Sequence, residues 1–189
     1  MRLATVGVSV TVLALSAWPA FSQHLGHAKI ESNSMAPYVA SPQSIVERML
    51  DVAGVKSGET VYDLGCGDGR ILITAVQRYH AKAVGVELNE KHAETAVDNI
   101  KRLNLQNRAQ VIKGNLMDVD IANADVVTLY LMTLSNDKLR PKLERELKPG
   151  TRVVSLNYQV RGWKAKAVEE AEAFHRPYKI YLYEVPSRQ

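Results

Sequence analysis

The sequence predicts an α/β domain of three layers, in which a mostly parallel sheet lies between two layers of helices. Short apolar runs rich in β-branched residues alternate along the chain with stretches whose apolar residues recur at three- and four-residue steps. The first pattern is typical of buried strands and the second of amphipathic helices, and their alternation favours parallel strands joined by crossover helices. The 189 residues, 46% hydrophobic and 23% charged, suffice for one globular domain with its own core.

The first elements surround a glycine-rich loop. A helix is expected to open at Ser41 and Pro42, since Ser is a good N-cap and Pro fits the first helical position, and to end at Gly54. The first strand is expected at residues 60–64, because it holds two β-branched residues and a tyrosine before the glycines. A helical pattern then begins at Arg70.

The later elements follow the same alternation. Residues 178–185 alternate as a strand, and residues 165–170 are a candidate antiparallel partner for it. The other predicted strands lie at 81–87, 110–113, 124–130 and 152–158, and the other predicted helices at 90–103 and 135–147. At least five strands are therefore expected.

Residues 1–22 have the features of a secretory signal peptide. Arg2 provides the charged start, residues 3–17 are nearly free of strong polarity, and residues 20–22 offer the small side chains of a cleavage site. Such a leader predicts an exported or periplasmic protein.

Two alternatives remain open for this end of the chain. Residues 3–20 are instead an uncleaved anchor that associates with the membrane, although the apolar run is short for a spanning helix. A start of translation at Met35 predicts a cytoplasmic protein. In each case residues 23–36 are expected to be a linker and residues 37–189 the folded domain.

Three glycines at alternate positions, Gly65, Gly67 and Gly69, join the first strand to its helix. They let a ligand approach the backbone, and the free N–H groups of the helix start face the same space. The spacing lacks the third glycine of a dinucleotide fingerprint and the lysine of a phosphate loop. Asp63 and Asp68 would repel a pyrophosphate but favour an ammonium group or a sugar hydroxyl. S-adenosylmethionine, a cationic nucleoside without phosphate, fits these requirements.

The stretch from Asp63 to Gly69 resembles motif I of the class I S-adenosylmethionine-dependent methyltransferases. Residues 37–42, 61–70 and 146–150 resemble the small protein-lysine methyltransferases of mitochondria and their bacterial relatives. The resemblance implies a Rossmann-like, three-layer α/β fold. Its seven-stranded, mostly parallel sheet would close with an antiparallel C-terminal hairpin.

The resemblance also implies where the cofactor lies. Glu87 ends the second predicted strand, where the superfamily binds the ribose hydroxyls. Asn115 stands where relatives carry the Asp that takes the adenine amino group, with Asp118 as the competing candidate. Tyr38 and Val39 either fold over the cofactor as a lid or pack against the first helix. The predicted cofactor-binding residues are Tyr38, Asp63, Gly65, Cys66, Gly67, Asp68, Gly69, Glu87, Leu88, Asn115, Leu116 and Tyr130.

Other features of the sequence argue against further sites. Five histidines and one cysteine are scattered without metal-ligand spacing, so no metal is expected. Cys66 is expected to fill a tight loop rather than to react, and Trp163 either lines a substrate channel or packs. The formal charge is +4 and basic residues are interleaved with acidic ones, which predicts no nucleic-acid binding.

We therefore expect transfer of a methyl group from S-adenosylmethionine, and the resemblance implies that a lysine side chain of a protein accepts it. No catalytic base is assigned, because a dry channel can lower the pKa of a lysine, although Tyr38, Asp68 and Tyr130 are candidates to orient the amine. A monomer is expected. The alternatives are an exported, non-catalytic domain that binds another ligand or partner, and a nicotinamide-dependent oxidoreductase, which the missing third glycine disfavours.

Overall fold

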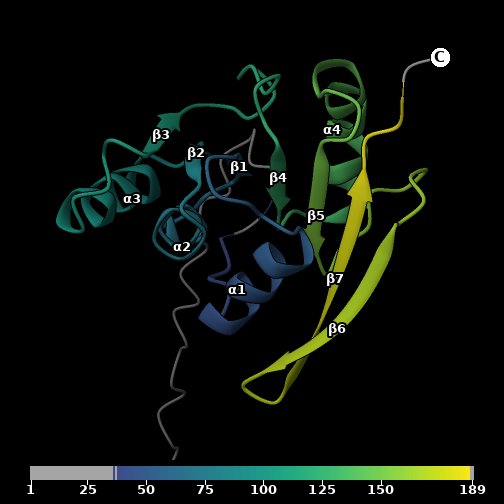
Figure 1. Ribbon diagram of the computed structural model, residues 1–189, viewed down its shortest axis with the longest axis horizontal. Coiled ribbons are helices and arrows are strands. Elements are labelled where there is room, and N and C mark those ends of the chain that lie inside the picture. Colours follow the sequence, from purple (N-terminus) through teal and green to yellow (C-terminus); the bar gives the residue numbers. More distant parts are fainter. Residues whose placement is uncertain (1–35, 37, 188–189) are drawn as a thin grey trace, which may run out of the picture.

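Seven strands form one sheet in the order β3-β2-β1-β4-β5-β7-β6 in the computed structural model, which describes residue 36 and residues 38–187 (Figure 1). Strands β1 to β5 pair in parallel, and β7 pairs antiparallel with both β5 and β6. The predicted mostly parallel sheet with an antiparallel C-terminal hairpin is confirmed. The strands are β1 (Thr60–Leu64), β2 (Lys82–Glu87), β3 (Ala109–Lys113), β4 (Val126–Leu129), β5 (Arg152–Leu156), β6 (Ala167–Ala173) and β7 (Arg176–Glu184).

Helices cover both faces of the sheet, as the three-layer prediction requires. Because side chains alternate along a strand, Val61 of β1 joins a core with α1, α2 and Ile100 of α3, whereas Leu64 joins the core on the other face. There it packs with Leu139 and Leu143 of α4. The helices in the described part of the chain are α1 (Gln43–Val52), α2 (Arg70–Tyr79), α3 (Glu90–Arg102) and α4 (Thr133–Glu146).

The first helix begins one residue later than predicted. Pro42 is the N-cap of α1, its carbonyl oxygen accepts from the N–H groups of Ile45 and Val46 at 3.0 Å, and no side chain caps the helix. Ser41 is buried, and its carbonyl oxygen accepts from Arg70 of α2. The predicted cap by Ser41 is wrong, since a tertiary contact with the glycine loop holds this residue instead.

The order of the strands determines where a ligand can bind. The chain passes from β1 to β2 and β3 on one side and then to β4 and β5 on the other, and ligands of open α/β sheets bind beyond the carboxyl ends of the strands at such a reversal. The last pair between β5 and β7 joins Leu156 and Ile180. Residues 176–179 and their partners on β6 therefore project past the carboxyl end of β5 (Figure 1).

Several predictions concern residues that lie outside the described ones. These are the leader or anchor at residues 1–22, the linker up to residue 35, and Pro37. Within residues 38–187, none of the helices is long and apolar enough to cross a membrane.

Candidate active site

The glycine loop between β1 and α2 has a backbone conformation that side chains disfavour. Gly65, Gly67 and Gly69 have φ angles of 95°, 54° and 80°. The N–H of Gly65 donates to the carbonyl oxygen of Val86 at 2.8 Å, which ties the loop to the end of β2. A Cβ at Gly67 would lie 2.5 Å from the ring of Tyr38, so the loop has no room for a side chain there.

The carboxylate of Glu87 is fixed beside this loop at the end of β2. One oxygen accepts from the N–H of Gly67 at 2.9 Å, and the other accepts from the N–H of Asn89 at 2.8 Å. Asn89 in turn caps α3 by accepting from the N–H of His92. A carboxylate has about four lone-pair sites, so Glu87 can still accept from the hydroxyl groups of a ribose. The structure thus places Glu87, the residue predicted to bind the ribose, against the glycine loop.

Asp63 is buried beneath the loop, on β1. Its carboxylate accepts from the hydroxyl of Thr128 on the neighbouring strand β4 at 2.7 Å. Burial, together with the nearby charges of Glu87 and Asp68, raises the pKa of Asp63 to about 7, although the hydrogen bond from Thr128 acts to lower it. The carboxyl groups of Asp63, Asp68 and Glu87 therefore lie close together at the carboxyl ends of β1 and β2 and form the acidic edge of the site. A cationic ligand would relieve their mutual repulsion.

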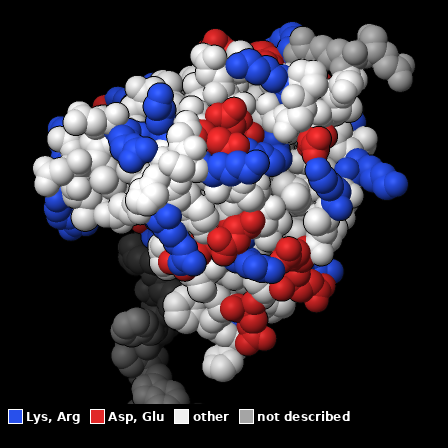
Figure 2. Space-filling view, in the orientation of Figure 1, with Lys and Arg blue, Asp and Glu red and all other residues white. Residues whose placement is uncertain are grey.

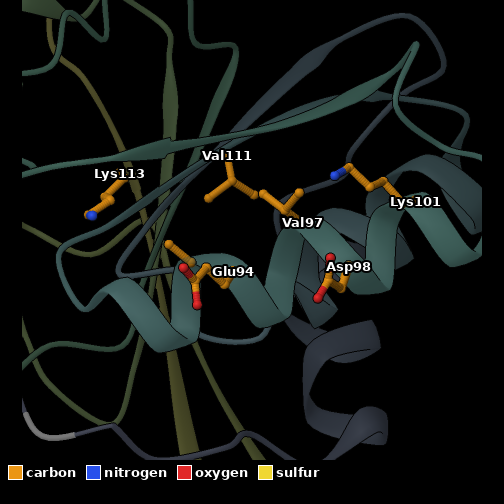
Figure 3. A pocket seen from close by; sticks show the side chains of 7 residues that line it. Glu94, Val97, Asp98, Lys101, Val111 and Lys113 are labelled. Carbon is orange, nitrogen blue, oxygen red and sulfur yellow. The ribbon is translucent and has the colours of Figure 1, made fainter.

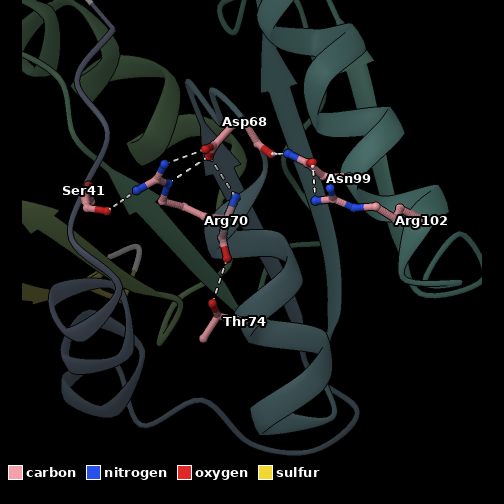
Figure 4. A network of polar contacts seen from close by, with 6 residues as sticks. All are labelled: Ser41, Asp68, Arg70, Thr74, Asn99 and Arg102. Atoms are coloured by element: carbon pink, nitrogen blue, oxygen red, sulfur yellow. Dashed lines mark hydrogen bonds and ion pairs between the residues drawn. The ribbon is translucent and has the colours of Figure 1, made fainter.

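Asp68 lies in a network that joins the loop to the segment before α1 (Figure 4). Arg70 donates to both of its carboxylate oxygens, at 2.9 and 2.5 Å, and also to the carbonyl oxygen of Ser41. This guanidinium lowers the pKa of Asp68, and Asn99 of α3 donates to the backbone oxygen of Asp68 at 3.0 Å. Arg70 is not among the predicted site residues, although an Asp two positions before a helical Arg is a signal for such a pair.

Tyr38 lies over the loop, where the lid interpretation places it. Its ring contacts Gly67 and stands 4.2 Å from the ring of His92, centroid to centroid, at 39°. Burial and the neighbouring Asp68 raise the pKa of Tyr38, so its hydroxyl stays protonated at neutral pH. Since 47% of Tyr38 is exposed, the residue covers the loop without entering the core.

The loop after β3 contains the predicted adenine contacts. The side-chain oxygen of Asn115 accepts from the N–H of Met117 at 3.0 Å, so the side-chain amide nitrogen is left as its donor toward a ligand. Leu116 is buried and Asp118 is exposed, whereas Leu88 at the end of β2 is half-buried. This geometry favours Asn115 as a donor to an adenine ring nitrogen over its role as an acceptor.

Tyr130 follows β4 on the other side of the loop. Its neighbour Leu131 is buried, and a Cβ at Gly65 would lie 3.4 Å from Leu131. The hydroxyl of Tyr130 accepts from the side-chain amide of Asn157 at 3.4 Å, and its ring centroid lies 6.3 Å from that of Tyr158. Asn157 and Tyr158 have no distinctive spacing in the sequence, and they are not among the predicted site residues.

Cys66 and Trp163 both pack against neighbouring residues. Cys66 is buried against the backbone of Gly85, and burial raises the pKa of its thiol, as expected for an inert residue in a tight loop. The indole of Trp163 packs edge-on against Tyr183 at 5.8 Å and donates to Glu144 at 2.7 Å. Trp163 is thus half-buried and packs against the core beside α4.

A separate groove of about 410 Å³ lies between α3 and the edge strand β3 (Figure 3). Val97 and Val111 face each other across it, and acidic and basic side chains surround them. None of the residues that line it is among the predicted cofactor residues. On the face shown in Figure 2, acidic and basic side chains lie side by side, so that this face carries no broad field of one sign.

Comparison with known proteins agrees with this geometry. A family model described as the ANTKMT methyltransferase domain matches residues 63–167, a span that contains the glycine loop, Glu87 and Tyr130. A protein-lysine N-methyltransferase of Saccharolobus islandicus is 49% identical over 148 residues, which are 78% of this chain and 92% of the relative. The adenine nucleotide translocase lysine N-methyltransferase of Mus musculus is 30% identical over 143 residues, 76% of this chain and 62% of the mouse protein.

A solved structure is also similar over most of the domain. An RNA methyltransferase from Salinibacter ruber, in complex with S-adenosyl-L-homocysteine, superposes with a TM-score of 0.76 and is 36% identical in sequence. The match covers 80% of this chain and 96% of that chain.

Proposed function

This chain belongs to the ANTKMT methyltransferase-domain family and uses S-adenosylmethionine, and we propose that it methylates a lysine side chain of a protein. The main support for the cofactor site is the position of Glu87, because two backbone N–H groups hold its carboxylate against the glycine loop. The acceptor follows from the two relatives whose names specify lysine. The family match favours an enzyme over a non-catalytic binding domain.

The residues of the chain fit this cofactor. Glu87 would accept from the ribose hydroxyls, and the side-chain amide of Asn115 would donate to the adenine. The acidic edge at Asp63 suits the positive charge of an α-ammonium or a sulfonium group, and Tyr38 would cover the bound nucleoside. A phosphate-bearing dinucleotide would meet repulsion at the same edge.

When bound, the cofactor supplies an activated methyl group: the lone pair of the acceptor amine forms the N–C bond while the C–S bond breaks and leaves its electrons on sulfur. The chain mainly aligns the two reactants and excludes water. The lysine must be neutral, and its proton passes to solvent. Burial raises the pKa of Tyr130, so this hydroxyl stays protonated and serves to orient the amine rather than to deprotonate it.

The test identifies the methylated atom. The full chain and tritium-labelled S-adenosylmethionine are incubated together with total protein of the source organism in one reaction, and with its total RNA in another. Protein is then hydrolysed to amino acids and RNA to nucleosides. We expect label in methylated lysine, and much less of it with Glu87→Ala when the concentration of S-adenosylmethionine is near the Kd of the parent chain. Label in nucleosides would instead favour the acceptor named for the Salinibacter ruber protein, and label in small molecules alone would overturn a macromolecular acceptor.

We also propose that the N-terminal segment directs the chain to the membrane or across it. The support is the apolar run at residues 3–17, which follows Arg2. Determining the N-terminus of the protein purified from its own cells tests this. A start at residue 23 indicates cleavage, residue 1 in a membrane fraction indicates an anchor, and a start at Met35 contradicts both.

A further inference from the structure

Three tyrosines lie close together beyond the carboxyl ends of strands β4 and β5. Tyr130 follows β4, Tyr158 follows β5, and Tyr178 lies on the part of β7 that projects past β5. Tyr130 and Tyr178 are half-buried against the core, and 38% of Tyr158 is exposed. Burial raises the pKa of Tyr130, and the nearby hydroxyls of Tyr178 and Tyr158 add to this effect. The cluster therefore opens to solvent at Tyr158, and Leu131, the residue after Tyr130, lies beside Gly65 of the glycine loop.

The chain makes an unusual turn between two of these tyrosines. Asn157 has a φ angle of 62°, and the N–H of Tyr158 donates to the carbonyl oxygen of Leu156 at 2.8 Å. A bond between residues two apart closes a γ-turn, and the form with positive φ at its centre is the rare and strained one. Glycine would adopt this conformation with little strain, whereas asparagine, although it tolerates a positive φ better than most residues, bears the strain of the γ-turn.

Several contacts hold the strained turn in place. The side-chain oxygen of Asn157 accepts from the N–H of Lys179 on β7 at 3.0 Å, and its own N–H donates to the carbonyl oxygen of Lys179 at 2.6 Å. On the other side, the carbonyl oxygen of Tyr158 accepts from Ser155 at 2.5 Å and from the fully buried Asn136 at 3.1 Å. Strain that neighbouring contacts maintain in this way is concentrated at functional sites.

The side chain of Asn157 joins the two parts of the cluster. Its oxygen is engaged by β7, and its amide nitrogen donates to the hydroxyl of Tyr130 at 3.4 Å. This contact is long, as contacts of catalytic sites often are before the substrate binds. A residue that merely ended β5 would need neither bond, so the asparagine sets the position of Tyr130 relative to β7.

We propose that Tyr130, Tyr158 and Tyr178 line the entry for the acceptor lysine, and that Asn157 is the positioning residue of this site. The inference rests on the proposed function. Aromatic faces contact the aliphatic stem of a lysine and attract its ammonium group, and phenol oxygens accept from its N–H bonds. The half-buried rings keep the inner end dry, which favours the neutral amine that attacks the methyl group.

The experiment uses a probe that requires no knowledge of the acceptor protein. The probe is an analogue of S-adenosylhomocysteine in which a nitrogen atom replaces the sulfur. An ethylene group joins this nitrogen to the nitrogen of a butylamine arm, which takes the place of the lysine side chain. Calorimetry compares the Kd of this analogue with the Kd of S-adenosylhomocysteine. The variants are Asn157→Gly, which adopts the turn without strain but loses both side-chain bonds, and Tyr178→Ala. Asn104→Gly is the matched control, because Asn104 has a φ angle of 57° at the end of α3.

We expect the parent chain to bind the arm analogue more tightly than S-adenosylhomocysteine. Asn157→Gly and Tyr178→Ala should each lose about fivefold or more of the affinity for the arm analogue, without change for S-adenosylhomocysteine. Asn104→Gly should change neither Kd. Equal affinity of the parent chain for both compounds, or variants that bind the arm analogue as the parent does, would overturn the acceptor site and leave the cofactor site standing. A parent chain that binds neither compound would overturn the proposed function as well.

Discussion

The buried carboxyl group of Asp63 makes the stability of the protein depend on pH in an unusual direction. The pKa of Asp63 rises from its ordinary value of 3.8 to about 7 in the folded protein, chiefly through burial. A group of this kind contributes stability that is fully present below pH 3.8 and is lost as the pH rises through 7. The full difference corresponds to about 4 kcal/mol, of which about 2.5 kcal/mol is lost between pH 5 and pH 8.

The substitution Asp63→Asn removes this titration. The amide oxygen can still accept from the hydroxyl of Thr128, which now lies 2.7 Å from the carboxylate. Urea denaturation at pH 5 and pH 8 gives the free energy of unfolding of each protein. We expect the parent chain to lose about 2.5 kcal/mol more than the variant between these pH values.

Two observations complete this test. Asp125→Asn replaces one exposed carboxylate just before β4 by an amide whose oxygen can still accept from the N–H of Thr60, and its curve should run parallel to that of the parent. If Asp63→Asn also runs parallel, Asp63 is ionised in the folded protein throughout this range, and the electrostatic description of the site is wrong. Asp63→Asn should also bind S-adenosylmethionine more weakly than the parent chain, because the acidic edge has lost a charge.

Three further predictions concern neighbouring features. Arg70→Met should weaken the binding of S-adenosylmethionine about tenfold by calorimetry, because the segment at Ser41 is no longer tied to the loop. Arg70→Lys should recover part of the loss, and equal affinities of the parent chain and Arg70→Met would contradict this prediction. Phe174 and His175 have φ angles of 52° and 57° in the turn between β6 and β7, so the double change to Asn-Gly should raise the Tm by a few degrees, and a lower Tm would argue against strain there. Cys66 should react with iodoacetamide only in urea, as followed by mass spectrometry, since rapid reaction of the folded protein is incompatible with its burial.

The sequence predicted the features that depend on local pattern. The strand before Gly65 and the helix after Gly69 follow from alternating and helical periodicity, and the glycines mark the turn where φ must be positive. The seven-stranded, mostly parallel sheet with its antiparallel C-terminal hairpin followed from the family resemblance. Glu87 was predicted from its place at the end of a strand, and its anchoring by backbone N–H groups agrees with that placement.

The features that depend on distant contacts were not predictable in the same way. Ser41 has the composition of a helix cap, but Arg70 on another helix binds its carbonyl group. Asn157 is strained because Asn136 and Lys179, which are far from it in the chain, fix the turn on both sides. No local pattern reports such contacts, so the acceptor side of the site required the structure.

The most direct test of the cofactor site is a calorimetric titration of the chain with S-adenosylmethionine, beside Glu87→Ala and Glu94→Gln. Glu87 is held against the glycine loop, whereas Glu94 is an exposed glutamate on α3. We predict micromolar binding by the parent chain and by Glu94→Gln, and a loss of about 1.5 kcal/mol or more with Glu87→Ala, since charge-assisted hydrogen bonds to the ligand disappear. Binding by Glu87→Ala as tight as that of the parent would contradict the site described here.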